Sequence, residues 1–168
     1  GGPGRSLKGT AALTEFNIEA TPLDSPEDAE EITISGATAD LPLSKTDLEL
    51  ISREKSNQLR VTGPVGFAID GNEKPAWGID AGPGRRNLPR KAVFTVETPI
   101  SHPQGTLLTF HLSQKHGGAN SDDKQNHNLG RFRRSLTTAP GATADPLPTR
   151  VRKILSVPRA ERTPLQEQ

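Results

Sequence analysis

Apolar and polar residues alternate along several stretches of this chain, with the period of two that predicts β-strands. In residues 11–20, Phe16, Ile18 and Ala20 fall on one side of an extended backbone. Residues 91–97 and 106–113 show the same alternation. The pattern predicts a core between two antiparallel sheets. Its expected members are Phe16, Ile18, Phe94, Val96, Phe110, Leu112 and Phe132.

Shorter signals predict the remaining strands. The β-branched run 32–34 indicates a second strand after a proline-containing loop. Residues 99–105 contain proline and glycine and have the length of a hairpin loop, so we expect strands 91–97 and 106–113 to be antiparallel neighbours. Residues 131–138 complete the set as a last strand.

Arg134 stands on the inward phase of this last strand, together with Phe132. A buried guanidinium without a partner carries a large desolvation cost. We therefore expect Arg134 either to reach an acidic side chain or to extend its charged end to the edge of the sandwich.

The conformation of residues 41–60 is left open by two competing patterns. Thr46 and Glu49 have the spacing of a capping box, and Leu48 and Ile51 lie three positions apart, as in a short helix. The leucines of the same stretch also alternate with acidic residues, as in a half-buried strand. A helix and a strand are both compatible with this stretch.

Several short strands without helices between them favour an all-β fold, a two-sheet antiparallel, jelly-roll-like sandwich, over a parallel α/β sheet. A chain of 168 residues fits one domain. We expect a linker at 1–10, the sandwich at 11–139 and an extended, proline-rich tail at 140–168. One or two helical turns are expected near Val151–Leu155.

The amino-acid composition excludes several kinds of chemistry and indicates a small core. Apolar residues make up 31% of the chain, and 16 glycines and 15 prolines indicate a small core with long loops. The net charge of +1 gives no reason to expect nucleic acid as a partner. The absence of cysteine excludes disulfides, thiol chemistry and covalent haem attachment in this segment. No apolar run has the length of a membrane span, so none is expected.

The turn Asp70-Gly71-Asn72 has the chemistry of a calcium site. Calcium prefers carboxylate, amide and backbone oxygens, which a tight turn at glycine brings together, so Asp70 and Asn72 are candidate ligands of a structural calcium ion. The same side chains can instead accept hydrogen bonds from their own backbone and simply close the turn. The sequence leaves both interpretations open.

A second group of residues has the chemistry of carbohydrate recognition. Trp77, the only tryptophan, can stack on a sugar ring, although a single tryptophan in a small sandwich also serves as a core residue. Arg85 and Arg86 belong to a basic cluster that can bind sulfate or carboxylate groups or can stay solvated. With His127, these residues are expected to converge at one end of the sandwich as a ligand-binding site.

Two further patterns do not favour a specific chemistry. His116, Asp122, Asp123 and His127 have the residue types of a transition-metal site, but the glycine-containing loop between them fixes no ligand register, so a hairpin tip is favoured over a metal site. The chain also lacks a nucleophile elbow, a zinc-protease motif and a phosphate-binding loop. An enzyme is therefore not expected.

A set of short motifs, spread over the chain from about Leu13 to its end, carries a family resemblance. The motifs are Ala-Ile-Asp-Gly at 68–71, Trp77, Ala-Val-Phe at 92–94, Gly-Thr-Leu-Leu-Thr-Phe at 105–110, Leu-Gly-Arg-Phe-Arg at 129–133 with Ser135 and Thr137, and Arg-Thr-Pro-Leu-Gln at 162–166. In order and spacing they resemble the β-sandwich module between the two large conserved domains of planctomycete proteins that carry cytochrome c domains. More distantly, the chain is similar to galactose-binding, discoidin-like carbohydrate-binding modules.

The resemblance implies a non-catalytic carbohydrate-binding (polysaccharide-binding) module of an exported multidomain protein, in the periplasm or at the cell surface. Its partners would be a glycan and the neighbouring domains, with the 140–168 tail leading to a following domain. The absence of methionine agrees with a piece of a longer protein. The alternative is a structural spacer or docking domain in a cytochrome c-containing envelope protein, without a small ligand. The family pattern favours an apolar residue where Arg134 stands.

Overall fold

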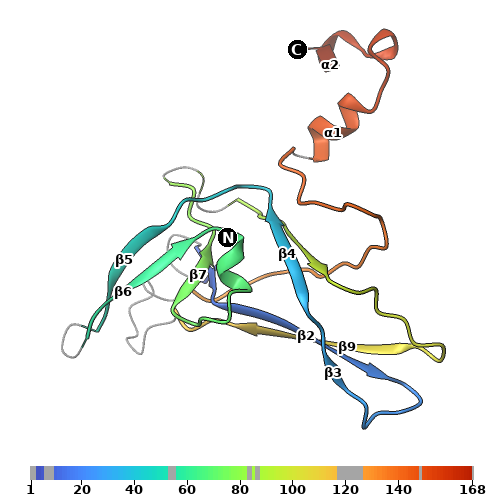
Figure 1. Ribbon diagram of the computed structural model, residues 1–168. Helices are drawn as coiled ribbons and strands as arrows, with labels where there is room; N and C mark the ends of the chain where they lie inside the picture. The colour runs from blue at the N-terminus through green and yellow to red at the C-terminus, as the bar shows by residue number, and fades with distance from the viewer. Residues whose placement is uncertain are drawn as a thin grey trace.

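The computed structural model describes residues 3–5, 10–52, 56–82, 85, 88–116, 127–147 and 149–167, with the backbone alone at 46–52, 56–60, 149 and 167. Strands dominate this part of the chain (Figure 1). They are β1 (Ala12–Leu13), β2 (Glu15–Pro22), β3 (Glu30–Glu31), β4 (Ile34–Ala39), β5 (Thr46–Ser52), β6 (Ser56–Gly63), β7 (Pro75–Gly78), β8 (Ala92–Val96) and β9 (Thr106–Ser113). The helical elements are η1 (Val65–Ala68), α1 (Thr149–Leu155), η3 (Arg159–Glu161) and α2 (Pro164–Glu167).

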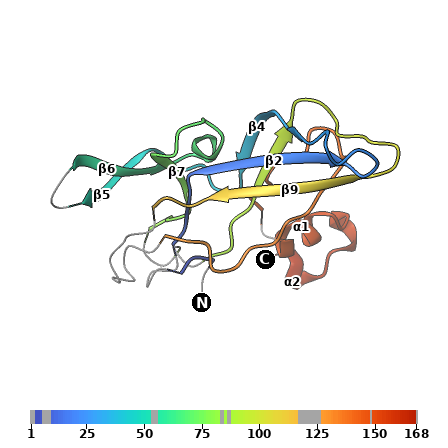
Figure 2. The same ribbon diagram turned by 90° about the horizontal axis from the view of Figure 1, so that it is seen from below.

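The strands form small sheets, most of whose pairs are antiparallel. β3, β2 and β9 make one sheet, β4 and β8 a second, and β1, β7, β6 and β5 a third, in which β6 and β7 run parallel. β2 and β9 pair along their full length, from Glu15 opposite Ser113 to Pro22 opposite Thr106. Figure 2 shows these two strands side by side, with the β5–β6 hairpin projecting at one end. The prediction of an all-β fold is confirmed.

The core lies between the β3-β2-β9 sheet and the β4-β8 sheet. Phe16 and Ile18 are buried, as their alternation predicted. The ring centroid of Phe16 lies 4.2 Å from that of Phe94 and 6.1 Å from that of Phe110, so this ring connects the two sheets. The half-buried residues that pack against the same cluster are Ile32, Ile34, Trp77, Phe94, Val96, Leu108, Phe110 and Leu112. The predicted core is thus confirmed in β2 and, as partly buried packing, in β8 and β9.

The predicted last strand at 131–138 is wrong, and so is the burial of Phe132. Residues 132–139 are described and form no strand. Phe132 is 56% exposed and Leu136 is 72% exposed. The three arginines at 131, 133 and 134 are exposed and stay hydrated. Phe132 and Leu136 alone offer too little apolar surface to offset the cost of ordering another strand.

The predicted pairing of β8 with β9 is also wrong. β8 pairs with β4 and β9 pairs with β2, so the loop between β8 and β9 crosses from one sheet to the other. The loop length was compatible with a hairpin, but the eight residue pairs that β9 forms with β2 determine its place in the sheet.

Within residues 41–60, the described stretches 46–52 and 56–60 adopt the strand alternative. They contribute β5 and most of β6, which form an antiparallel hairpin. The second predicted strand begins two residues later than the run 32–34 and continues to Ala39 as β4, with a register shift between Ile34 and Gly36.

The C-terminal tail runs extended from the sheets to two short helices, which stand apart from the strands (Figure 1). The backbone N–H of Ala144 donates to Oγ1 of Thr38 at 2.8 Å, which fastens the tail to β4. Helix α1 confirms the helical turns expected near Val151–Leu155. Among the described helices, none is long and apolar enough to cross a membrane.

Candidate functional site

The turn from Asp70 to Lys74 follows η1 and is closed by its own side chains. The backbone N–H of Asn72 donates to Oδ1 of Asp70 at 2.9 Å, and the N–H of Lys74 donates to Oδ1 of Asn72 at 3.1 Å. Gly71 has a φ of 71°, which is the left-handed region that favours glycine. The turn is therefore of the self-bonded kind that the sequence offered as the alternative to a calcium loop, and each side chain keeps further acceptor capacity.

Contacts from two other segments hold this turn in place. Nε2–H of the buried His116 donates to the carbonyl oxygen of Lys74 at 2.7 Å. Nζ of Lys115 lies 3.6 Å from Oε1 of Glu73. The N–H of Lys115 also donates to the buried Oγ1 of Thr14 at 3.3 Å. The turn is thereby fixed against the start of β2 and the end of β9.

Glu15, the first residue of β2, is a site residue that sequence analysis missed. Its side chain lies against the turn and only 7% of the residue is exposed, and its Oε1 atom has no hydrogen-bond partner within the described residues. Burial raises the pKa of the Glu15 carboxyl; the backbone N–H of Asn72 opposes this shift, and the neighbouring Asp70 carboxyl reinforces it. The alternation of β2 placed Glu15 on the solvent side, so no local signal marked it.

The structure brings two of the predicted glycan-binding residues to opposite sides of β1. Trp77 lies on β7 opposite Leu13, and its half-buried side chain packs against the core. The backbone carbonyl of His127 accepts a hydrogen bond from the N–H of Ala12 at 2.8 Å, on the other side of β1. Trp77 thus contributes to packing, as the alternative interpretation of a lone tryptophan anticipated.

The predicted basic cluster is described only in part. Arg85 is exposed on a turn in which its N–H donates to the carbonyl of Gly82 at 3.0 Å. The guanidinium of Arg90 donates to the carbonyl of Arg85 at 3.0 Å. Arg86 lies outside the described residues. Convergence of these arginines with Trp77 and His127 therefore stays a prediction.

The group His116, Asp122, Asp123 and His127, for which a hairpin tip was favoured over a metal site, lies half outside the described chain, because Asp122 and Asp123 are not among the described residues. His116 is committed through Nε2 to the Asp70–Lys74 turn. Where the structure describes side chains, no three His, Asp or Glu residues gather as a metal-binding group.

An open groove beside β9 was not predicted. Its volume is about 750 Å³, and its lining is Leu108, Phe110, Phe132, Arg134, Ser135 and Leu136. The guanidinium carbon of Arg134 lies 4.9 Å from the ring centroid of Phe110, in cation–π contact. Arg134 is exposed, so its charge reaches solvent beside the core. The strand that was expected to carry Arg134 is not formed, because the described residues 132–139 are irregular. The Gly-Arg-Phe-Arg motif at 130–133 was the sequence signal for this groove, but it was interpreted as part of a strand.

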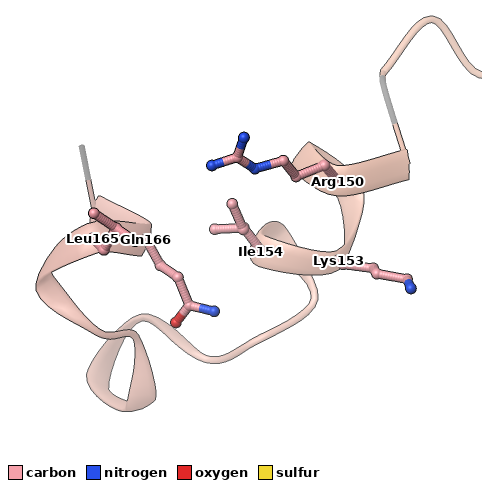
Figure 3. Close-up of a pocket in the computed structure, with 5 residues that line it drawn as sticks. All are labelled: Arg150, Lys153, Ile154, Leu165 and Gln166. Atoms are coloured by element: carbon pink, nitrogen blue, oxygen red, sulfur yellow. The ribbon is translucent and has the colours of Figure 1, made fainter.

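A second open pocket lies between α1 and α2 in the tail (Figure 3). Its volume is about 480 Å³, and Arg150, Lys153, Ile154, Leu165 and Gln166 line it. Arg162 donates from Nε to the carbonyl of Val157 at 2.9 Å, which fixes the chain between the helices. Leu155 and Leu165 are 52% and 76% exposed, so the tail presents apolar side chains beside basic ones.

Comparison with known proteins found no matching protein-family model, no matching curated protein and no matching solved structure. The resemblance to the planctomycete module therefore stays a prediction.

Proposed function

We propose that this chain is a non-catalytic carbohydrate-binding module of an exported multidomain protein, acting outside the cytoplasm on an anionic polysaccharide. The proposal includes the finer architecture expected from the sequence, a jelly-roll-like sandwich with the β3-β2-β9 and β4-β8 sheets as its layers. The tail at 140–168 would connect it to a following domain. The observation that supports this function best is the groove beside β9.

The groove combines the two kinds of group that sugars need. Phe132 is 56% exposed and presents an apolar ring that can cover the C–H face of a sugar. Arg134 is held over Phe110, and its planar guanidinium can donate paired hydrogen bonds to a carboxylate or sulfate. The groove is open rather than enclosed, which suits a long polymer passing across the surface. One shallow site of this kind corresponds to about 4–8 kcal/mol, in the millimolar to micromolar range.

Affinity electrophoresis in gels containing dextran sulfate, with neutral dextran as the comparison, tests the proposal. The chain should be retarded by the sulfated polymer and not by the neutral one. Phe132→Ala and Arg134→Ala should each weaken the retardation about tenfold, which corresponds to about 1.4 kcal/mol. Arg133→Ala is the matched control, because it removes the same charge from an exposed neighbour that does not line the groove.

The same assay separates the groove from the site expected from sequence. Arg85→Ala with Arg86→Ala tests the end of the sandwich near Trp77. Loss of retardation only in this double variant would move the glycan site to that end. Retardation unchanged in every variant would refute glycan recognition through either group of residues.

Exposed apolar side chains in the tail favour a second candidate function, a spacer or docking domain without a small ligand. Leu165 is 76% exposed and lines the pocket with Arg150 and Lys153 (Figure 3). Leu155, on α1, is 52% exposed. Such surfaces become buried when a neighbouring domain packs on them. Amide hydrogen exchange across 149–167 should then be slower in the parent multidomain protein than in the isolated chain. Equal exchange rates would argue against docking through the tail.

A further inference from the structure

We infer that Glu15 and Asp70 together hold a calcium ion against the Asp70–Asn72 turn. The inference adds a buried ligand from β2 to the two loop residues that the sequence suggested. It does not depend on glycan binding, because the groove beside β9 is built from other residues.

The first argument is the environment of the Glu15 carboxylate. The residue is 7% exposed, and the backbone N–H groups of Asn72 and Gly71 donate to its carboxyl. Oε1 is nevertheless fully buried without a hydrogen-bond partner in the described part of the chain. A buried carboxylate oxygen without a partner is costly, and a cation is one of the few groups that can offset this cost. The basic side chains that follow β9 face other atoms. Lys115 lies beside Glu73, and Nε2–H of His116 points to the carbonyl of Lys74.

The second argument is the oxygen supply of the turn. One oxygen of Asp70 accepts the Asn72 N–H, and the Asp70 carboxyl also lies within hydrogen-bonding reach of the Glu15 carboxyl. Two carboxylates this close repel each other unless a proton or a cation lies between them. Oδ1 of Asn72 accepts the Lys74 N–H at 3.1 Å and retains a second lone pair. The positive φ of Gly71 and the His116 contact hold these groups in place before any ion binds. A preformed turn reduces the entropy lost on binding.

The third argument selects the ion. The donors are carboxylate and amide oxygens, which hard cations prefer, and two carboxylates match a charge of +2. Calcium accepts irregular geometry and completes its shell with water, which the exposed side of Asp70 admits. Magnesium requires near-ideal octahedral geometry that a turn and one strand residue do not supply. With so few protein ligands the dissociation constant should fall in the range of about 10⁻⁴–10⁻³ M typical of extracellular modules.

Isothermal titration of the chelator-treated chain with calcium chloride measures the site directly. One calcium ion should bind per chain, and magnesium chloride should bind at least tenfold more weakly. In parallel, the melting temperature in 10 mM calcium chloride should exceed that in chelator by about 3–10 °C, because an ion bound only by the folded state stabilises that state.

Variants then assign the ligands. Glu15→Gln and Asp70→Asn keep the shape of each side chain, and each should abolish the calcium-dependent rise in melting temperature. The matched control is Asp80→Asn, since Oδ1 of Asp80 accepts the Gly82 N–H at 2.8 Å in a similar turn. This variant should keep the full calcium response.

Two results would overturn the inference. The first is the absence of calcium binding to the wild-type chain in the titration, which needs no variant to be interpreted. The second is a calcium response that persists in Glu15→Gln. A chain that binds calcium but no sulfated polymer would support the ion site and reject the proposed function.

Discussion

Replacing Phe16 with alanine should remove the ring that connects the two main sheets. Phe16 is buried on β2, and its centroid lies 4.2 Å from that of Phe94 on β8 and 6.1 Å from that of Phe110 on β9. Truncating a buried phenylalanine typically costs about 3–5 kcal/mol. Loss of the stacked pairs, about 0.5–1.5 kcal/mol each beyond area burial, favours the upper part of that range. For a chain of this size the melting temperature should fall by roughly 6–20 °C.

The assay is urea unfolding followed by tryptophan fluorescence, because Trp77 packs against the same core. The matched control is Phe132→Ala, which removes the same ring from a residue that is 56% exposed. This control should change the free energy of unfolding by no more than about 0.5 kcal/mol. Equal destabilisation by the two variants, or a cost below about 1 kcal/mol for Phe16→Ala, would refute the core described above.

Gly78→Ala should destabilise the sheet by about 1–3 kcal/mol, because the new Cβ would lie 2.7 Å from Cβ of Thr62 on the neighbouring strand. Gly36→Ala, where no atom lies within 4 Å of the new Cβ, should cost clearly less in the same urea titration. The raised pKa of Glu15 means that the folded state binds this proton more tightly than the unfolded state. In chelator, this stabilisation is therefore complete below the ordinary pKa near 4.5 and is lost as the pH rises through the folded-state pKa. Glu15→Gln should remove this loss from melting curves recorded between pH 4 and pH 8, and a loss of the same size in both proteins would contradict the assignment.

Strand positions could be predicted where the evidence is local. In β2 and β9 the alternating apolar residues lie on one face, because the side chains of an extended backbone alternate whatever the strand pairs with. Partners could not be predicted in this way. β8 and β9 are close in sequence, yet each pairs with a strand from the N-terminal part of the chain. Which two strands pair depends on residues far apart in the sequence, and a short stretch of sequence does not contain both strands.

Part of the candidate site could likewise be predicted from the sequence, and part could not. The Asp70–Asn72 turn was evident from residue types, since short polar side chains around a glycine close a turn through their own backbone. The role of Glu15 depended on the tertiary structure. Its place in the alternation predicted exposure, but the turn after η1 covers that face of β2 and buries the carboxyl beside Asp70. The sequence by itself therefore determined the positions of β2, β8 and β9 and of the turn, but not the irregular course of residues 132–139. Tertiary packing alone decided which polar side chain is buried, because burial depends on which segments meet.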